Sequence, residues 1–149
     1  MELKVKKLHK YAILPRKAHA TDACFDLFAV ELDVDEEWFY KTGIAIEIPE
    51  GYYGQILTRS GMAKVGIFVV GGVIDSGYRG EIKVFIQCPG LDGWLYDEKG
   101  KELQKYCKSQ AIAQLAILPV PECEIVEVDE LSQSDRGENG FGSTDQKEA

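Results

Sequence analysis

Short alternations of apolar and polar residues recur along the chain, and their period of two is that of β-strands. Apolar side chains occupy alternate positions in several segments: Leu3 and Val5; Ile44, Ile46 and Ile48; and Ile82, Val84 and Ile86. Ile125 with the nearby Val128 gives a weaker signal for a strand. Turn residues separate these segments at Thr42-Gly43, Pro49-Glu50-Gly51, Pro89-Gly90 and Lys99-Gly100. Short strands at such spacing are typical of a sandwich or barrel, so the chain is predicted to be all-β.

The rest of the pattern predicts one short helix and a C-terminal arm. The helix is a turn after Arg59 that runs through Met62 to Lys64, with Ser60 placed to cap its exposed amides. From residue 132 onward the chain becomes polar and glycine-rich. We therefore expect a β domain over residues 1–131 and a mobile arm over residues 132–149. Residues 88–108 are predicted to add a hairpin, either a surface decoration or a contact for a partner protein.

The composition fits one globular domain, because 45% of the 149 residues are hydrophobic and 28% are charged. No apolar run is long enough to cross a bilayer, so neither export nor membrane insertion is expected. The cysteines form no CxxC pair, which argues against zinc and redox motifs and favours idle thiols in a reducing cytosol. They are Cys24, Cys88, Cys107 and Cys123. The expected location is the cytoplasm, or the interior of a host cell if the source is viral.

Charge is distributed unevenly along a chain whose net charge is −8. Residues 1–20 carry six Lys and Arg against one acidic residue, whereas residues 121–149 carry nine acidic residues against two basic ones. A net acidic surface repels phosphate backbones, so direct nucleic-acid binding is not expected, although a local arginine cluster still suits one small polyanion. The basic start either pairs with the acidic end, within or between subunits, or the two termini are solvated independently.

The segment GVIDSGYRG, residues 72–80, places a carboxylate and a phenol on a predicted hairpin bounded by glycines. Its entry, Val73-Ile74, and its alternating exit predict two strands, and Asp75-Ser76-Gly77 carries the turn chemistry. Gly77 allows a positive φ, so the backbone can turn tightly and keep Asp75 on a rigid strand end close to Tyr78. By itself, the segment is better explained as an ordinary hairpin with a solvated aspartate.

Further segments carry groups that suit an anionic ligand. Arg59-Ser60-Gly61 offers a guanidinium, a hydroxyl and an open backbone amide, which suit phosphate oxygens, or else forms a capped turn with a surface arginine. The segment RGENGFGST, residues 136–144, is either a disordered terminus or a lid whose Phe141 stacks on a planar base. Gln114 is the only polar residue of the core-like segment 112–117, where a satisfied core amide is the usual explanation.

Taken in the order in which they occur along the chain, these segments and one further segment resemble the motifs of the trimeric dUTP pyrophosphatases, or dUTPases. The resemblance extends over nearly the whole chain. The matching segments are ATDACFDLFA (20–29), TRSGMA (58–63), GVIDSGYRGEI (72–82), IAQL (112–115) and RGENGFGST (136–144). The chain departs from the family pattern at Cys24, where glycine is usual, and at Gly77, where an acidic residue is frequent. It also has Ser109-Gln110-Ala111 in place of the usual Gly-Asp-Arg.

The resemblance implies a fold, an assembly and an activity. The implied fold is a distorted, jelly-roll-like β barrel of the β-clip type, assembled as a homotrimer whose C-terminal arms are exchanged between subunits. The implied reaction is hydrolysis of dUTP to dUMP and pyrophosphate, by attack of water on the α-phosphorus. Such an activity limits uracil incorporation into DNA and supplies dUMP for dTMP synthesis.

The resemblance also implies a role for each matching residue. Asp75 is the general base, and Tyr78 lies under the deoxyribose and rejects a 2′-hydroxyl. Uracil is recognised by the backbone of Gly72, Val73 and Ile74, with Lys83 as a further contributor. The phosphates are held by Arg59, Ser60, Gly61, Gln114 and Arg136, while Phe141 stacks on uracil and Gly142, Ser143 and Thr144 close the site. Mg²⁺ binds mainly through the substrate's oxygens, with Asp26 accepting hydrogen bonds from metal-bound water.

Two other functions fit the same fold. A dCTP deaminase needs a proton-shuttling glutamate beside serine and arginine near the base, and the sequence shows no such cluster. A non-catalytic protein would use the nucleotide pocket, or residues 88–108, to bind and regulate a partner. The joint presence of Asp75, Tyr78, Arg136 and Phe141 argues for catalysis.

Overall fold

The computed structural model describes residues 1–33, 39–64, 66–87 and 111–138. Strands predominate within these residues, and the helix there has five residues, so the all-β prediction is confirmed. The elements are β1 Lys4–Lys7, β2 Phe25–Phe28, β3 Glu31–Asp33, β4 Phe39–Lys41, β5 Ile44–Glu47, β6 Tyr52–Leu57, α1 Ser60–Lys64, β7 Phe68–Val69, β8 Val73–Ile74, β9 Lys83–Gln87 and β10 Ala111–Pro119.

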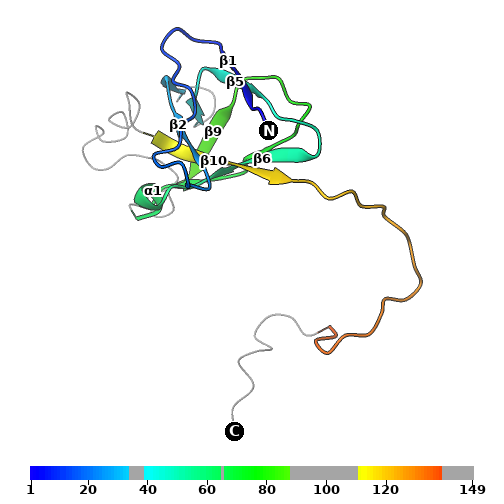
Figure 1. The fold of residues 1–149 in the computed structure, drawn as a ribbon. Helices are drawn as coiled ribbons and strands as arrows, with labels where there is room; N and C mark the ends of the chain where they lie inside the picture. The colour runs from blue at the N-terminus through cyan, green and yellow to red at the C-terminus, as the bar shows by residue number, and fades with distance from the viewer. Residues whose placement is uncertain (34–38, 65, 88–110, 139–149) are drawn as a thin grey trace.

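In these residues the strands form three sheets with antiparallel pairing (Figure 1). One sheet pairs β1 with β5, and the second has the order β2-β10-β6-β8. The third has the order β3-β4-β9-β7. Closure of the sheets into a jelly-roll-like barrel stays a prediction.

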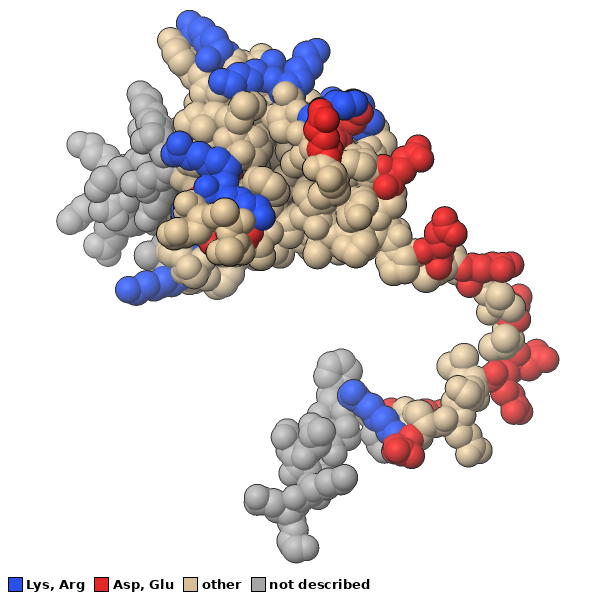
Figure 2. Space-filling model, in the orientation of Figure 1, with Lys and Arg blue, Asp and Glu red and all other residues tan. Residues whose placement is uncertain are grey.

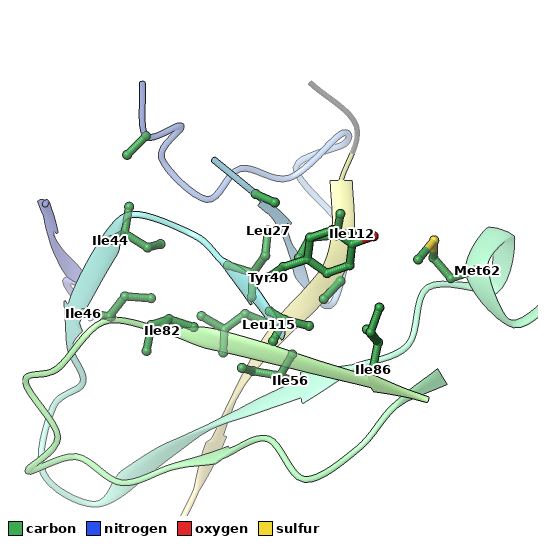
Figure 3. Close-up of a cluster of buried hydrophobic side chains, with 14 of the residues drawn as sticks. Leu27, Tyr40, Ile44, Ile46, Ile56, Met62, Ile82, Ile86, Ile112 and Leu115 are labelled. Carbon is green, nitrogen blue, oxygen red and sulfur yellow. The ribbon is translucent and has the colours of Figure 1, made fainter. Parts of the chain in front are cut away.

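The core lies between the sheets, where apolar residues from all three meet (Figure 3). Strand β9 keeps the expected alternation, with Val84 and Ile86 buried and its other residues exposed. Strand β10 is buried on both faces over much of its length, and its Ile112 and Leu115 are fully buried. Burying a Leu or Ile side chain contributes about 1.5–3 kcal/mol, so β10 is the best anchored strand of its sheet.

Polar contacts fix two of the connections around this core. The buried Thr42 donates its Oγ1 hydrogen to the carbonyl of Ile82 at 2.6 Å, which ties the β4–β5 turn to the start of β9. At the surface, Lys4 Nζ donates to Glu47 Oε1 at 2.8 Å across β1 and β5. This hydrogen bond raises the pKa of Lys4 and lowers the pKa of Glu47.

The segments around Asp75 differ from the prediction. Strand β8 pairs with β6, whereas β9 pairs with β4 and β7, so the predicted pairing of the two strands around Asp75 is wrong. The turn itself is present, because the Tyr78 amide donates to the Asp75 carbonyl at 3.1 Å. Gly77 is not among the glycines with positive φ, so the turn does not use the left-handed conformation that glycine allows there.

Residues 120–138 extend away from the body of the molecule as an arm (Figure 1). The strand weakly predicted at Ile125 and Val128 does not form in this single chain, so that prediction is wrong. Ile125 is 98% exposed. Acidic side chains are spaced along the arm, and most Lys and Arg of the face in view lie on the body (Figure 2). The hairpin predicted for residues 88–108 lies outside the described residues.

No helix in the described ranges is long and apolar enough to span a bilayer.

Candidate active site

Strand β10 brings the first, second and fourth sequence motifs together. Its Gln114 pairs with Asp26 of β2 on one side and with Leu57 of β6 on the other. The Gln114 side chain reaches past the end of β6, where Nε2 donates to the Thr58 carbonyl at 3.0 Å. Arg59 follows Thr58 directly, so it emerges beside the same pair of strands.

Arg59 is held by two partners from its own chain. Its Nε lies 3.0 Å from Asp26 Oδ1, and its Nη1 donates to the Ala111 carbonyl at 2.7 Å. The side chains of Arg59 and Asp26 are 37% and 24% exposed, so the ion pair faces water on one side only. Since a guanidinium carries five N–H donors, some remain for a ligand.

Helix α1 begins immediately after this arginine. The carbonyl of Arg59 accepts hydrogen bonds from the Met62 and Ala63 amides, both at 3.0 Å. Arg59 therefore occupies the N-cap position, and among the described residues neither amide donates a hydrogen bond to the Ser60 hydroxyl. The predicted cap at Ser60 is wrong, because the helix starts one residue earlier than expected. A Cβ built on Gly61 meets nothing within 4 Å, so its backbone is open as predicted.

Four of the residues described above, including Arg59 and Gln114 but not Gly61, line one cleft of about 460 Å³, which we name the Arg59 cleft. Its lining residues are Ala18, Asp22, Ala23, Cys24, Asp26, Arg59, Ser60 and Gln114. The half-buried Cys24 is a lining residue that sequence reasoning noted only as a departure from the family. The cleft therefore gathers a guanidinium, a hydroxyl and an amide, with carboxylates at its edge.

A second cleft of about 380 Å³, named the Asp75 cleft, holds the remaining groups from the body of the chain. It is lined by Gly72, Val73, Ile74, Asp75, Tyr78, Glu81, Lys83 and Phe85. Gly72 has a φ of 99°, and a Cβ there would lie 2.9 Å from the carbonyl oxygen of Ile56. Both its backbone angle and its close approach to β6 require glycine, and they set the path of β8.

Sequence reasoning missed Glu81 and Phe85 in the Asp75 cleft. Phe85 is 38% exposed and occupies an outward-facing position of β9, where a large aromatic residue breaks the polar side of the alternation. This break in the alternation is the sequence signal that could have identified Phe85 as a site residue. Lys83 also faces outward, and its Nζ lies 4.4 Å from the ring centroid of Phe39.

The predicted residues are thus divided between two clefts that share no lining residue. Arg136 lines neither cleft and belongs to the arm formed by residues 120–138 (Figure 1). Phe141, Gly142, Ser143 and Thr144 lie outside the described residues. In a single chain, the residues predicted to bind base and sugar line one cleft, whereas Arg59, Ser60 and Gln114, which are predicted to bind phosphates, line the other.

The family model for dUTPases matches residues 10–145 of the chain. The chain belongs to the dUTPase family. The family resemblance inferred from the motifs is confirmed.

Curated dUTPases match over almost the whole length. The deoxyuridine 5'-triphosphate nucleotidohydrolases of Clostridium kluyveri and Clostridium acetobutylicum are each 44% identical to the chain. The match spans 97% of this chain in both cases, with 98% and 97% of the two relatives. The family membership therefore covers the full domain and the arm, not an isolated motif.

Solved dUTPase structures share the fold. A variant of the phage 80alpha dUTPase superposes with a TM-score of 0.77 at 33% identity, covering 95% of this chain and 98% of that one. The Staphylococcus bacteriophage 80alpha dUTPase with dUpNHpp gives 0.73 at 34% identity, covering 95% and 97%. The dUTPase of phage phi11 of S. aureus, whose species-specific insert has been visualised, gives 0.72 at 30% identity, covering 90% and 100%.

Members of this dUTPase family use Mg²⁺, and a variant of the phage phi11 enzyme shows the coordination of a structural Mg(II) ion. In the described part of this chain, no group of three or more His, Cys, Asp or Glu is placed to hold a metal. The donor set therefore does not form an all-protein cage. It fits an ion that keeps its water and binds through substrate phosphates, for which a partly exposed carboxylate such as Asp26 suffices.

Replacing Arg59 with lysine tests its structural contacts. A lysine ammonium cannot reproduce the planar fork that contacts Asp26 and the Ala111 carbonyl together. Arg59→Lys is expected to lower the free energy of unfolding by about 1–2 kcal/mol, measured by chemical denaturation at one protein concentration. Arg16→Lys is the matched control, because Arg16 lies over the Phe28 ring, a contact that an ammonium can keep. An equal decrease in the free energy of unfolding in Arg59→Lys and Arg16→Lys would contradict this structural role of the Arg59 guanidinium.

Proposed function

We propose that this chain hydrolyses dUTP to dUMP and pyrophosphate by attack of water on the α-phosphorus. The observation that carries the proposal is that two clefts of a dUTPase-family chain offer different chemical groups. One cleft offers a carboxylate and a phenol beside exposed backbone, which suits a nucleoside. The other offers a guanidinium and a hydroxyl, which suit a phosphate chain. A related phage dUTPase has been solved with dUpNHpp.

Asp75 is proposed as the general base. It lies where β8 ends and the turn to Tyr78 begins, so its position is fixed by backbone pairing on one side and by the turn hydrogen bond on the other. Its carboxylate accepts a proton from water as the water oxygen attacks the α-phosphorus. Such proton transfer contributes about 10²–10⁴-fold to the rate.

The backbone of β8 is proposed to recognise uracil. In the described residues β8 is the last strand of its sheet, so a neighbouring strand uses the backbone groups of only one of its edges. The polar edge of a planar base can imitate a strand there, as peptides do at other sheet edges. Gly72, Val73 and Ile74 supply these groups, and the Tyr78 ring lies under the deoxyribose. Lys83, drawn toward Phe39, is a weaker candidate contact.

The Arg59 cleft is proposed to hold the phosphates. The remaining donors of Arg59, the Ser60 hydroxyl, the Gly61 amide and the Gln114 side chain bind their oxygens. Arg136 and the arm residues Phe141, Gly142, Ser143 and Thr144 complete and close the site. Mg²⁺ bound with the substrate would neutralise the repulsion between linked phosphates, and Asp26 would accept hydrogen bonds from the water that the ion retains.

The active protein is proposed to be a homotrimer in which each arm crosses to a neighbour. The two clefts of one chain share no lining residue, which supports active sites that are assembled from several subunits. In this assembly, each cleft of a chain contributes to a different active site. The arm supports the same assembly, since Ile125 and Leu131 are 98% and 88% exposed in a single chain. Apolar side chains exposed along an extended segment indicate a surface that is covered by a partner.

Product analysis with four nucleotides tests the activity. The purified protein is incubated with Mg²⁺ and dUTP, dCTP, dTTP or UTP separately, and the products are resolved by ion-exchange chromatography. Formation of dUMP and pyrophosphate from dUTP alone is expected. Deamination of dCTP would instead identify the protein as a dCTP deaminase, the other enzyme class considered for this fold. Lack of turnover of all four nucleotides would favour a binding or regulatory function.

The variant Asp75→Asn tests the general base. An amide keeps the shape of the carboxylate but cannot accept the proton, so turnover should fall by about 10²-fold or more while nucleotide binding persists. Steady-state kinetics and isothermal titration with a non-hydrolysable dUTP analogue measure the two effects. Asp129→Asn, which makes the same change on the exposed arm outside every motif, serves as control. Near-normal turnover in Asp75→Asn would remove this residue from the mechanism.

Deletion of residues 137–149 tests the arm. The truncated protein should keep the folded trimer, because the segment 120–131 is retained, and should lose most dUTP hydrolysis because the closing residues are gone. Light scattering gives the oligomeric state, and product analysis gives the activity. Full activity after truncation would refute the lid, and a monomer that still hydrolyses dUTP would refute the shared site.

A further inference from the structure

The Tyr78 ring in the Asp75 cleft lies directly against Gly80. A Cβ built on Gly80 would lie 2.3 Å from Tyr78 Oη, 2.5 Å from Cζ and 3.0 Å from Cε2. Favourable contacts between non-bonded carbon atoms occur at about 3.5–4.0 Å, so no side chain larger than hydrogen fits while the ring keeps its place. An alanine at this position would push the ring away by roughly 1 Å or more.

The backbone of Gly80 does not itself require glycine. The described glycines with positive φ are Gly43, Gly51, Gly66, Gly71, Gly72 and Gly137, and Gly80 is not among them. An alanine can therefore adopt its backbone conformation without the strain of the left-handed region. The need for glycine at this position comes from the ring.

Backbone hydrogen bonds hold the ring and its turn in this arrangement. Tyr78 Oη donates to the Glu81 carbonyl at 3.1 Å, which places the end of the ring over residue 80. Arg79 Nη1 donates to the carbonyls of Ser76 and Tyr78 at 2.6 and 2.9 Å, which braces the turn from outside. Tyr78 remains 43% exposed, so a displaced ring has room to move into solvent. The weaker element in a clash at residue 80 is thus the side chain, not the backbone.

We propose that Gly80 is a positioning residue for the Tyr78 ring and thereby sets how strictly the site distinguishes deoxyribose from ribose. The proposal rests on the proposed function, in which this ring lies under the sugar. A ring displaced outward leaves room for a 2′-hydroxyl. A ring displaced inward takes space from deoxyribose, while UTP is already rejected. Both displacements lower the ratio of kcat/KM for dUTP to kcat/KM for UTP.

Steady-state kinetics of the full-length protein with Mg²⁺ test this ratio in Gly80→Ala. Gly77→Ala is the matched control, since Gly77 lies in the same turn, lacks a positive φ and leaves open space for a Cβ. The ratio should fall about tenfold or more in Gly80→Ala and change less than about twofold in Gly77→Ala. A wild-type ratio in folded Gly80→Ala would overturn the proposal.

A double-mutant cycle with Tyr78→Ala separates the ring from any backbone role of Gly80. Once the ring is removed, Gly80→Ala should change the melting temperature no further, because the clashing partner is absent. An equal loss of melting temperature with and without the ring, or failure to fold in both backgrounds, would show that Gly80 serves the backbone and would refute the proposal. This cycle measures melting temperatures and so does not require the protein to be active. Failure of the proposed function is recognised separately, because the wild-type protein would then not hydrolyse dUTP.

Discussion

The candidate phosphate site depends on the register of one central strand. Strand β10 pairs with β2 and β6 at once, and its Gln114 lies opposite both Asp26 and Leu57. A slip of one residue would move the fully buried Ile112 and Leu115 out of the close-packed positions that they occupy in the core, so the core packing fixes this register. The precision of the Arg59 cleft is therefore set by the packing of apolar side chains and not by the loops that border it.

Arg59 combines a structural and a ligand-binding capacity in one guanidinium. Its contacts with Asp26 and the Ala111 carbonyl fix its orientation before any anion arrives. Because the group is already ordered, an arriving phosphate need not immobilise a flexible side chain, which is the usual entropic cost of such contacts. The pairing also compensates the charge of the guanidinium in a half-exposed position, so that the empty cleft does not hold an uncompensated cation.

The strand content and the chemical groups followed from the sequence, whereas their spatial grouping did not. Periodicity located β9 because Val84 and Ile86 alternate with exposed residues, and the motifs identified the family. Periodicity cannot say which strands pair, so the assignment of β8 and β9 to different sheets was missed. Ile125 and the nearby Val128 gave a weak signal for a strand, but in the described residues of a single chain they have no partner strand. Local spacing likewise gave no sign that Arg59 and Asp75 line separate clefts.

The passage of the chain from β8 to β9 crosses from one sheet to another, and Asp75 lies on that crossing. Proteins open in cooperative units that often coincide with such groups of strands. If the two sheets open as separate units, transient opening of either one carries the turn away from the strand edge beside it. The population of molecules in which the Asp75 carboxylate is held in place then depends on both closing equilibria, which makes the position of this carboxylate more sensitive to temperature and denaturant than either sheet alone.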